Sequence, residues 1–409
     1  MAETGNVNLT SRSREIIEAD LRYGAHNYAP LPVVLERGEG VFVWDVDGRR
    51  YYDMLSAYSA LNQGHRHPKI VAAAVEQLGR LTLTSRAFHN DVMHRFLRKI
   101  CELTGFEKAL PMNSGAEGVE TAIKAMRKWG YRYKGIENNQ AEIIVCENNF
   151  HGRTTTIVGF SSDPDAYEGF GPPTPGFKRI PYNDPAALEA AITPQTCGFL
   201  VEPIQGEAGV IIPDPGYLRA VRDICTRHNV ILCLDEIQTG LGRTGRLFCF
   251  EHEEIRPDMV ILGKALSGGL YPISAVACDD WIMRVFEPGT HGSTYGGNPL
   301  ACAIGIAALD VIVEERLADR AAELGAYFLS KLRTLEHPRL KEVRGLGLLA
   351  AVEFTEPIAK DFCKLLKERG ILAKDTHGTT VRFAPPLVIT EGQIDEAFQM
   401  IVAALEALP

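Results

Sequence analysis

Hydrophobic positions follow a strand-like pattern in the first sixty residues, and from residue 67 onward helical patterns alternate with short apolar runs. The change divides the chain into regions of different structure. The first sixty residues contain two short β-like segments, 40–48 and 49–60, joined at Asp47 and Gly48 in the manner of a hairpin turn. We therefore expect a small antiparallel unit at the start of the chain.

From residue 67 onward, stretches with helical periodicity alternate with short apolar runs. This alternation predicts an α/β fold in which helices cover a mainly parallel sheet. The apolar runs that we expect to be strands are 141–147, 197–204, 229–236, 258–263 and 273–278.

A second α+β unit is expected towards the end of the chain, after a long helical pattern over 293–315. Segments 341–354 and 379–390 have the character of strands, and helical patterns separate and follow them. We predict a large α/β domain over 65–303 and a smaller domain formed by an N-terminal segment, 1–64, and a C-terminal segment, 304–409.

The composition narrows the class of protein. A chain of 409 residues with 45% hydrophobic content can bury a large core, and a net charge of -9 without a basic block argues against nucleic acid or an anionic membrane as partner. Nine cysteines form no CxxC pair, and residues 1–20 contain no apolar signal region. We expect reduced thiols and a cytoplasmic protein without a membrane span.

One residue in VILGKALSGGLYP, residues 260–272, is unexpected, because Lys264 directly follows an apolar strand. Its stem could pack on apolar surface while its ammonium group reaches water. Alternatively, burial could lower its pKa and leave a neutral amine that attacks a carbonyl group to form a Schiff base. The residues around it must decide between the two.

Two further features point to a cofactor. Asn113, Ser114 and Gly115 precede a strong amphipathic helix, whose first backbone amides could hold a phosphate group, although a simple N-cap would explain Ser114 equally well. Asp235 ends a strand at the edge where open α/β sheets bind ligands. Together with Lys264, these features supply the three contacts that pyridoxal 5'-phosphate needs: a Schiff-base lysine, a carboxylate for the pyridine nitrogen and a phosphate site.

Two other motifs carry less weight. The sequence GLGRTG, residues 240–245, matches a dinucleotide fingerprint, but no helical pattern follows it, so we do not expect nicotinamide or flavin binding. His65 and His67 have no acidic or cysteine neighbour in the sequence, which favours a loop over a metal site.

The chain resembles the class III pyridoxal-phosphate aminotransferases of fold type I over nearly its whole length. Their hallmark stretches here include VFVWDVDGRRYYD, YSALNQGHRHPKI, VEPIQGEAGV, LDEIQTGLGRTGR, LGKALSGGLYPISAV, HGSTYGGNPLA and RFAPPLVI. Within the family, the sequence is most similar to the members that act on ornithine.

The resemblance implies roles around the cofactor ring. Lys264 would form the Schiff base and, once displaced by the substrate amine, move the substrate proton. Asp235 would pair with the pyridinium nitrogen, and Gln238 would contact the ring oxygen. Phe150 and Ile237 would cover the two faces of the ring.

The resemblance also implies a shared phosphate site. Backbone amides of Gly115 and Ala116 would bind the phosphate group, and Ser293 and Thr294 would reach it from a second subunit. A homodimer is then the minimum unit, with dimers or tetramers equally compatible with the sequence.

Substrate recognition, by the same resemblance, depends on charge. Arg153 and Arg382 match two carboxylate-binding arginines, and Glu207 matches a glutamate that masks Arg382 while ornithine occupies the site. Tyr28 and Tyr58 match tyrosines of the ornithine pocket.

The implied reaction transfers the δ-amino group of L-ornithine to 2-oxoglutarate, which gives glutamate 5-semialdehyde and glutamate. Acetylornithine or 4-aminobutyrate transamination remains an alternative, as does an aminomutase or epimerase that needs no separate 2-oxo acid. One departure is His151, which stands where the animal ornithine enzymes have tryptophan; a histidine is common there elsewhere in the family.

Overall fold

The computed structural model describes residues 10–408. Residues 1–9 of the predicted N-terminal segment, and residue 409, lie outside the described part of the chain.

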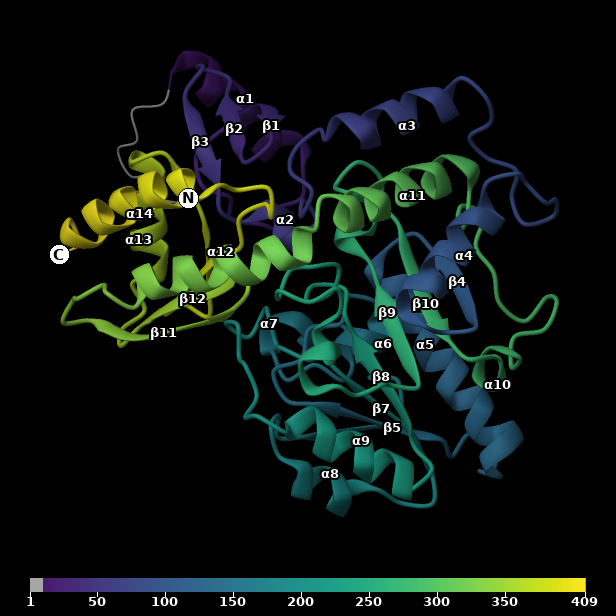
Figure 1. Ribbon diagram of the computed structural model, residues 1–409. Helices are drawn as coiled ribbons and strands as arrows, with labels where there is room; N and C mark the ends of the chain where they lie inside the picture. The colour runs from purple at the N-terminus through teal and green to yellow at the C-terminus, as the bar shows by residue number, and fades with distance from the viewer. Residues whose placement is uncertain (1–9, 409) are drawn as a thin grey trace.

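A seven-stranded sheet forms the centre of the molecule, in the order β4-β10-β9-β8-β7-β5-β6 (Figure 1). Strands β9, β8, β7, β5 and β6 are parallel, whereas β10 pairs antiparallel with both of its neighbours. The predicted mainly parallel α/β sheet is confirmed. Its strands are β4 (Lys108–Met112), β5 (Glu142–Cys146), β6 (Phe177–Ile180), β7 (Thr196–Val201), β8 (Ile231–Asp235), β9 (Met259–Leu262) and β10 (Ser274–Cys278).

The sheet is buried on both faces. Ile143 and Val145 of β5 point into a core with α5 (Gly115–Trp129), whereas Ile144 and Cys146 point into the larger core on the other face. Burial on both faces explains why the central strands are continuous apolar runs in the sequence.

Two smaller sheets are built from the N- and C-terminal parts of the described chain. The first has the order β1-β2-β3-β13 and includes the predicted hairpin, since β2 and β3 pair antiparallel around a turn at Asp45–Gly48. Strand β13 pairs parallel with β3, so the N- and C-terminal segments share a sheet. The domain boundaries themselves remain a prediction. The strands of the two sheets are β1 (Leu35–Glu39), β2 (Phe42–Asp45), β3 (Arg50–Asp53), β13 (Ile371–Leu372), β11 (Leu340–Leu346), β12 (Leu349–Phe354), β15 (Thr380–Phe383) and β14 (Lys374–Thr376).

Helices cover the sheets and connect them. The long helical pattern predicted over 293–315 is a helix only from Pro299, because Asn298 caps it and proline favours the first helical position. The helices are α1 (Ser11–Tyr23), α2 (Ser56–Ser59), α3 (Pro68–Leu78), α4 (Met93–Thr104), α5 (Gly115–Trp129), α6 (Thr155–Val158), α7 (Pro164–Tyr167), α8 (Pro185–Ala191), α9 (Tyr217–Arg227), α10 (Asp280–Met283), α11 (Pro299–Glu314), α12 (Leu317–Leu332), α13 (Ala359–Glu368) and α14 (Glu391–Glu406).

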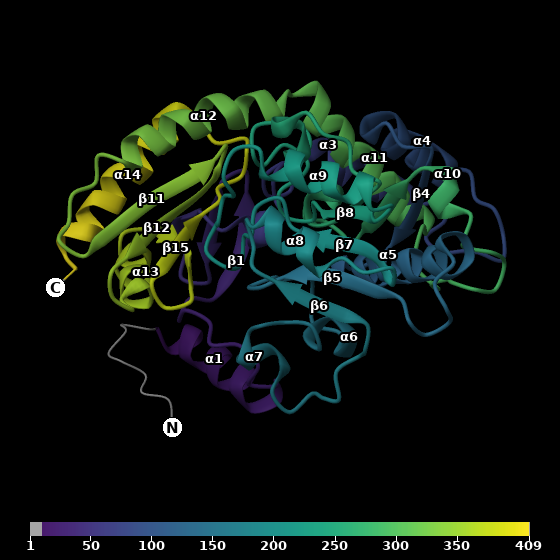
Figure 2. The ribbon, with the colours of Figure 1, turned by 90° about the horizontal axis from the view of Figure 1, so that it is seen from below.

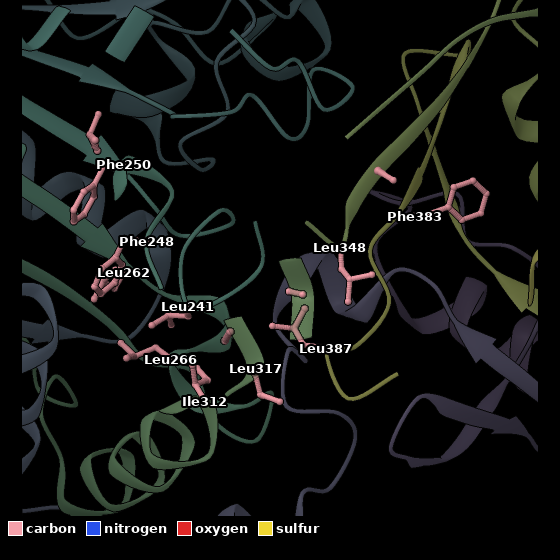
Figure 3. Packing of buried hydrophobic residues seen from close by; sticks show 14 of the residues in the cluster. Leu241, Phe248, Phe250, Leu262, Leu266, Ile312, Leu317, Leu348, Phe383 and Leu387 are labelled. Carbon is pink, nitrogen blue, oxygen red and sulfur yellow. The ribbon is translucent and has the colours of Figure 1, made fainter. Parts of the chain in front are cut away.

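A continuous apolar core joins the central sheet to the C-terminal sheet. Leu262 ends β9 and Leu266 lies in the 3-10 helix after it, and the same cluster extends into the C-terminal part through Leu317, Leu348 and Leu387 (Figure 3). Helix α12 lies along this junction and packs on β11 and β12 (Figure 2). The two parts of the chain are therefore held in one fixed arrangement, which matters for a site built from both.

Candidate active site

Lys264 lies directly beyond β9, in a short 3-10 helix, Lys264–Ser267. Its φ of 46° is in the left-handed region, which non-glycine residues seldom adopt and which occurs at functional sites. Burial lowers the pKa of Lys264 from its ordinary value, although Glu207 and Asp235 oppose this effect. Of the two interpretations of Lys264, the geometry favours the reactive amine.

Asp235 ends β8 with both carboxylate oxygens engaged. Oδ1 accepts a hydrogen bond from the Ile237 backbone N–H at 3.1 Å, and Oδ2 lies 2.7 Å from His151 Nδ1. Burial alone would lower the pKa of His151. The hydrogen bond and the negative charge of Asp235 outweigh this effect, so the pKa of His151 is raised. The contact orients Asp235, and His151 Nε2 is buried without a hydrogen-bond partner among the described residues.

The start of α5 has the character of an anion site. Ser114 Oγ accepts a hydrogen bond from the Glu117 backbone N–H, and Glu117 Oε2 accepts one from the Ser114 backbone N–H. Ser114 is thus the N-cap that its sequence allowed. The capping box leaves the next two amides, of Gly115 and Ala116, at the positive end of the helix dipole without a partner in the described chain.

Ile237 packs between this helix start and the loop that carries Lys264. A Cβ atom on Gly115 would lie 2.9 Å from Ile237 Cδ1, and one on Gly263 would lie 3.3 Å from Ile237 Cγ2. A larger residue at position 115 would therefore push the end of the Ile237 side chain aside. Through Ile237, the end of β8, the loop that carries Lys264 and the start of α5 lie close together.

Phe150 lies on the loop that carries His151. The loop passes α5 closely at Gly152, whose φ of 128° suits glycine and whose added Cβ would lie 2.9 Å from Ala116 Cβ. The Phe150 ring remains 37% exposed, and its backbone N–H donates to Glu202 Oε2 at 3.0 Å. An aromatic face is therefore available beside the anion site.

Arg382 and Glu207 form a bidentate ion pair, which we call the masking pair. Arg382 Nη1 lies 2.7 Å from Glu207 Oε1, and Nη2 lies 3.0 Å from Oε2. Burial alone would raise the pKa of Glu207, but the Arg382 guanidinium outweighs it and lowers the pKa to about 2. The pair is therefore ionised throughout the physiological range of pH.

Gln238 connects the masking pair to the N-terminal part of the chain. Its Nε2 donates to Glu207 Oε1 at 3.0 Å and to the Tyr58 backbone oxygen at 3.5 Å. Its Oε1 is buried without a partner in the described residues, and an added Cβ on Gly206 would lie 1.4 Å from that oxygen. Glycine at residue 206 is thus required for Gln238 to occupy this position.

Tyr58 belongs to a backbone segment whose conformation the sequence did not predict. The β-like character predicted for 49–60 holds only for β3, Arg50–Asp53. The short element α2, Ser56–Ser59, has positive φ at all four residues and is a left-handed turn. The left-handed conformation costs roughly 1–2 kcal/mol per L-residue. Burial raises the pKa of Tyr58, whose ring centroid is 5.4 Å from Arg382 Cζ.

Four predicted residues lie at the edge of this cluster or apart from it. Arg153 is exposed and stacks over the Phe150 ring at 5.7 Å, and Tyr28 is 73% exposed. Ser293 Oγ accepts a hydrogen bond at 3.0 Å from Asn113 Nδ2 of its own chain, and Thr294 is exposed. The predicted contact of Ser293 and Thr294 with a second subunit remains a prediction.

Glu202 is a functional candidate that the sequence interpretation did not identify. It is 7% exposed, and burial raises its pKa to about 8, with Asp235 adding to the rise and His151 opposing it. It directly follows Val201, the last residue of β7, a position common to many capping carboxylates, so the sequence contained no signal that distinguished it.

The two motifs that we set aside have structural roles. GLGRTG does not open an α-helix, and only a short 3-10 helix, Cys249–Glu253, lies between it and β9. The buried Arg243 guanidinium donates to the backbone oxygens of Leu348 and Pro385. His65 and His67 each have an acidic partner, contrary to our expectation: His65 contacts Asp53 at 2.7 Å, and His67 contacts Glu315 at 2.9 Å.

The described residues contain neither a metal-binding cluster nor a membrane-spanning helix. Residues 10–408 contain no group of three or more histidine, cysteine or acidic side chains arranged to hold a metal ion. No helix in this part of the chain has the length and apolar character needed to cross a membrane.

Comparison with known proteins gives consistent matches. The family described as "Aminotransferase class-III" matches residues 23–405. An ornithine aminotransferase of Brevibacillus brevis is 55% identical over 395 residues, which cover 97% of this chain and 99% of the relative.

Two solved structures show how far the likeness extends. The ornithine aminotransferase of Toxoplasma gondii ME49 is 48% identical, with a TM-score of 0.96, over 98% of this chain and 96% of that one. An acetylornithine aminotransferase from Elizabethkingia anophelis is 52% identical, with a TM-score of 0.89, over 97% and 99% of the two chains.

Proposed function

This chain belongs to the class-III aminotransferase family, and we propose that it transfers the δ-amino group of L-ornithine to 2-oxoglutarate. The products are glutamate 5-semialdehyde, which cyclises to pyrroline-5-carboxylate, and glutamate. Relatives named as ornithine aminotransferases, 55% and 57% identical over nearly the whole chain, support this substrate.

The masking pair is the observation that carries the proposal. A transaminase must accept two substrates in one site, and here ornithine presents an amine where glutamate presents an α-carboxylate. With Glu207 bound in bidentate fashion, Arg382 has no charge to offer a carboxylate, which suits the ornithine half-reaction. When Glu207 moves away, the buried guanidinium becomes the partner for the carboxylate of glutamate or 2-oxoglutarate.

The residues around Lys264 fit pyridoxal 5'-phosphate. Gly115 and Ala116 offer two amides at a helix start, Asp235 offers a buried carboxylate held by His151, and Ile237 and Phe150 supply apolar faces. When bound, this cofactor supplies an electron sink that makes the proton on the amine-bearing carbon of the substrate removable.

Each protein group then has a definite task. Asp235 balances positive charge on the ring nitrogen, and its hydrogen bonds with Ile237 and His151 keep the carboxylate in place. Lys264 would hold the cofactor covalently and serve as the group that moves the substrate proton, for which a lowered pKa suits it. Gln238 would contact the ring oxygen from a position that Gly206 leaves open.

Three further residues would contact the substrate. Arg153 would bind the distal carboxylate, since its guanidinium lies over Phe150 and is exposed to the entrance. Tyr28 and Tyr58 would line the ornithine pocket, and Tyr28 is close enough to Tyr58 to add to the rise in its pKa.

We also propose a cytoplasmic homodimer in which Ser293 and Thr294 of one protomer contact the phosphate group held by the other. Exposed apolar side chains on and after α3 and near Ser293 support an interface in this region, because isolated monomers seldom expose several together. These side chains are Val75, Leu78, Leu81, Phe88 and Tyr295.

A second candidate donor is acetylornithine, because a solved acetylornithine aminotransferase is 52% identical to this chain. Tyr58 favours ornithine, since the related acetylornithine and 4-aminobutyrate enzymes usually lack a tyrosine at this place. The test compares initial rates for ornithine, acetylornithine and 4-aminobutyrate, with and without 2-oxoglutarate. The proposal requires ornithine to have the highest kcat/KM and to need the acceptor; product without an acceptor would indicate an aminomutase or epimerase.

A further inference from the structure

The left-handed turn Ser56–Ser59 is an unusual feature of the backbone. Its four residues have φ values of 50°, 46°, 62° and 71°, and none of them is glycine. Backbone hydrogen bonds close it, from Tyr58 N to Leu55 O at 3.0 Å and from Ala60 N to Ser56 O at 2.8 Å. L-residues adopt this region as single residues rather than as consecutive turns, so surrounding structure must impose the conformation.

Asp53 and His65 hold the start of the turn. Asp53 Oδ1 accepts hydrogen bonds from the backbone N–H groups of Leu55 at 3.0 Å and Ser56 at 2.8 Å, and Oδ2 contacts His65 Nε2 at 2.7 Å. The side chains of Ser56 and Ser59 are buried, with hydroxyl groups that have no partner in the described chain. The strained backbone and the buried, unpaired hydroxyl groups both lower the stability of the fold, so the need for a stable fold does not explain the turn.

The turn ends against the masking pair. Its Tyr58 carbonyl accepts the long hydrogen bond from Gln238 Nε2, and the same Nε2 donates to Glu207 Oε1. The Tyr58 ring lies beside the Arg382 guanidinium. Gln238 is thus held on the side of Glu207 that keeps this carboxylate on Arg382.

We propose that the left-handed turn Ser56–Ser59 is a positioning element that stabilises the masking pair and thereby sets the preference for ornithine over glutamate. The inference rests on the proposed function. Asp53 and His65 act as positioning residues through the turn, and they have no contact of their own with the masking pair among the described residues.

Ala57 allows a test that changes backbone preference with little change in packing, because its side chain is exposed. Ala57→Gly and Ala57→Asn accept the left-handed region, whereas Ala57→Val opposes it. Ala57→Leu is a milder opposing change in case the valine variant does not fold. The measurement is single-turnover kinetics of full-length holoenzyme with ornithine alone and with glutamate alone, followed by cofactor absorbance.

We expect Ala57→Val to lower the ornithine rate relative to the glutamate rate by about tenfold, the penalty of one strongly disfavoured left-handed residue. Ala57→Leu should shift the ratio in the same direction by less, and Ala57→Gly and Ala57→Asn should stay within about twofold of wild type with an undiminished Tm. An unchanged ratio in both opposing variants, or equal loss of both half-reactions, would overturn the inference. A wild-type enzyme that fails to react with ornithine would instead refute the proposed function.

Discussion

Removing the charge of Glu207 should expose Arg382 permanently and reverse the substrate preference of the enzyme. The magnitude follows from the masking pair itself. The contact is bidentate, with oxygen to nitrogen distances of 2.7 and 3.0 Å, and the Glu207 side chain is 25% exposed. The fall in the pKa of Glu207 from 4.5 to about 2 corresponds to roughly 3 kcal/mol of stabilisation of its charge.

We test this with Glu207→Ala and the matched variant Glu207→Gln, which keeps the size of the side chain and one accepting oxygen but not the charge or the second acceptor. Because each 1.4 kcal/mol is a factor of ten, the ratio of kcat/KM for glutamate to that for ornithine should rise by roughly 30- to 100-fold in both variants. The rate of the glutamate half-reaction should be unchanged or higher than in wild type, and ornithine should begin to react at its α-amine.

The assay is single-turnover kinetics of each half-reaction, followed through cofactor absorbance, with amino-acid analysis of the ornithine product. Equal losses for both substrates would show that Glu207 has only a structural role and that the masking argument is wrong. A shift in Glu207→Ala without one in Glu207→Gln would assign the effect to lost volume rather than to charge.

Three further predictions concern the same site. Arg382→Ala should cripple glutamate and 2-oxoglutarate by about 30-fold or more and ornithine far less, whereas Arg153→Ala should slow both substrates; steady-state kcat/KM for each substrate decides, and equal effects of the two variants would contradict the assignment. Asp235→Asn should lower turnover by several orders of magnitude yet leave Tm nearly unchanged, because a polar isostere at a strand end disturbs little while the ring nitrogen loses its counter-charge; an early-melting variant with full specific activity would reverse this. Glu202 keeps its proton in the folded state up to about pH 8 but loses it near 4.5 when unfolded, so its contribution to stability is complete below pH 4.5 and falls by roughly 1.4 kcal/mol per pH unit between these values. Glu202→Gln should remove that part of the slope in urea unfolding measured from about pH 5 to 8, and an unchanged slope would show that Glu202 is ionised in the folded protein.

Much of the fold was predictable because its elements have strong local signals. The five central strands are buried on both faces, so each is a continuous apolar run that no helix period explains. The edge strands β4 and β6 were not predicted, since Lys108, Pro111 and Lys178 interrupt their apolar character, as is common at sheet edges.

The chemistry at the strand ends was likewise predictable from the sequence. Lys264 and Asp235 follow parallel neighbouring strands, and the carboxyl ends of such strands meet at one edge of the sheet. The masking role of Glu207 and the pocket role of Tyr58 came from the family resemblance, because nothing local in the sequence pairs residues 175 positions apart.

Contacts that tertiary structure imposes could not be predicted. The His151 side chain reaches Asp235 across 84 residues of sequence, and its motif gives no indication of the partner. The left-handed turn at Ser56–Ser59 opposes local backbone preference, since its residues include no glycine to accept a positive φ. Asp53, held by the half-buried His65, supports it from outside the turn. Both features lie at the site, where local rules are most often violated.

Transfer of labelled nitrogen shows directly whether the enzyme moves the δ-amino group of ornithine to 2-oxoglutarate. Full-length holoenzyme is incubated with ornithine carrying ¹⁵N at the δ-amine and with unlabelled 2-oxoglutarate, and the glutamate formed is analysed by mass spectrometry, with Lys264→Ala as the control. Our account predicts that the glutamate carries the label in the wild-type reaction and that the variant forms almost none. Unlabelled glutamate from the wild-type enzyme, or labelled glutamate formed equally fast by Lys264→Ala, would contradict it.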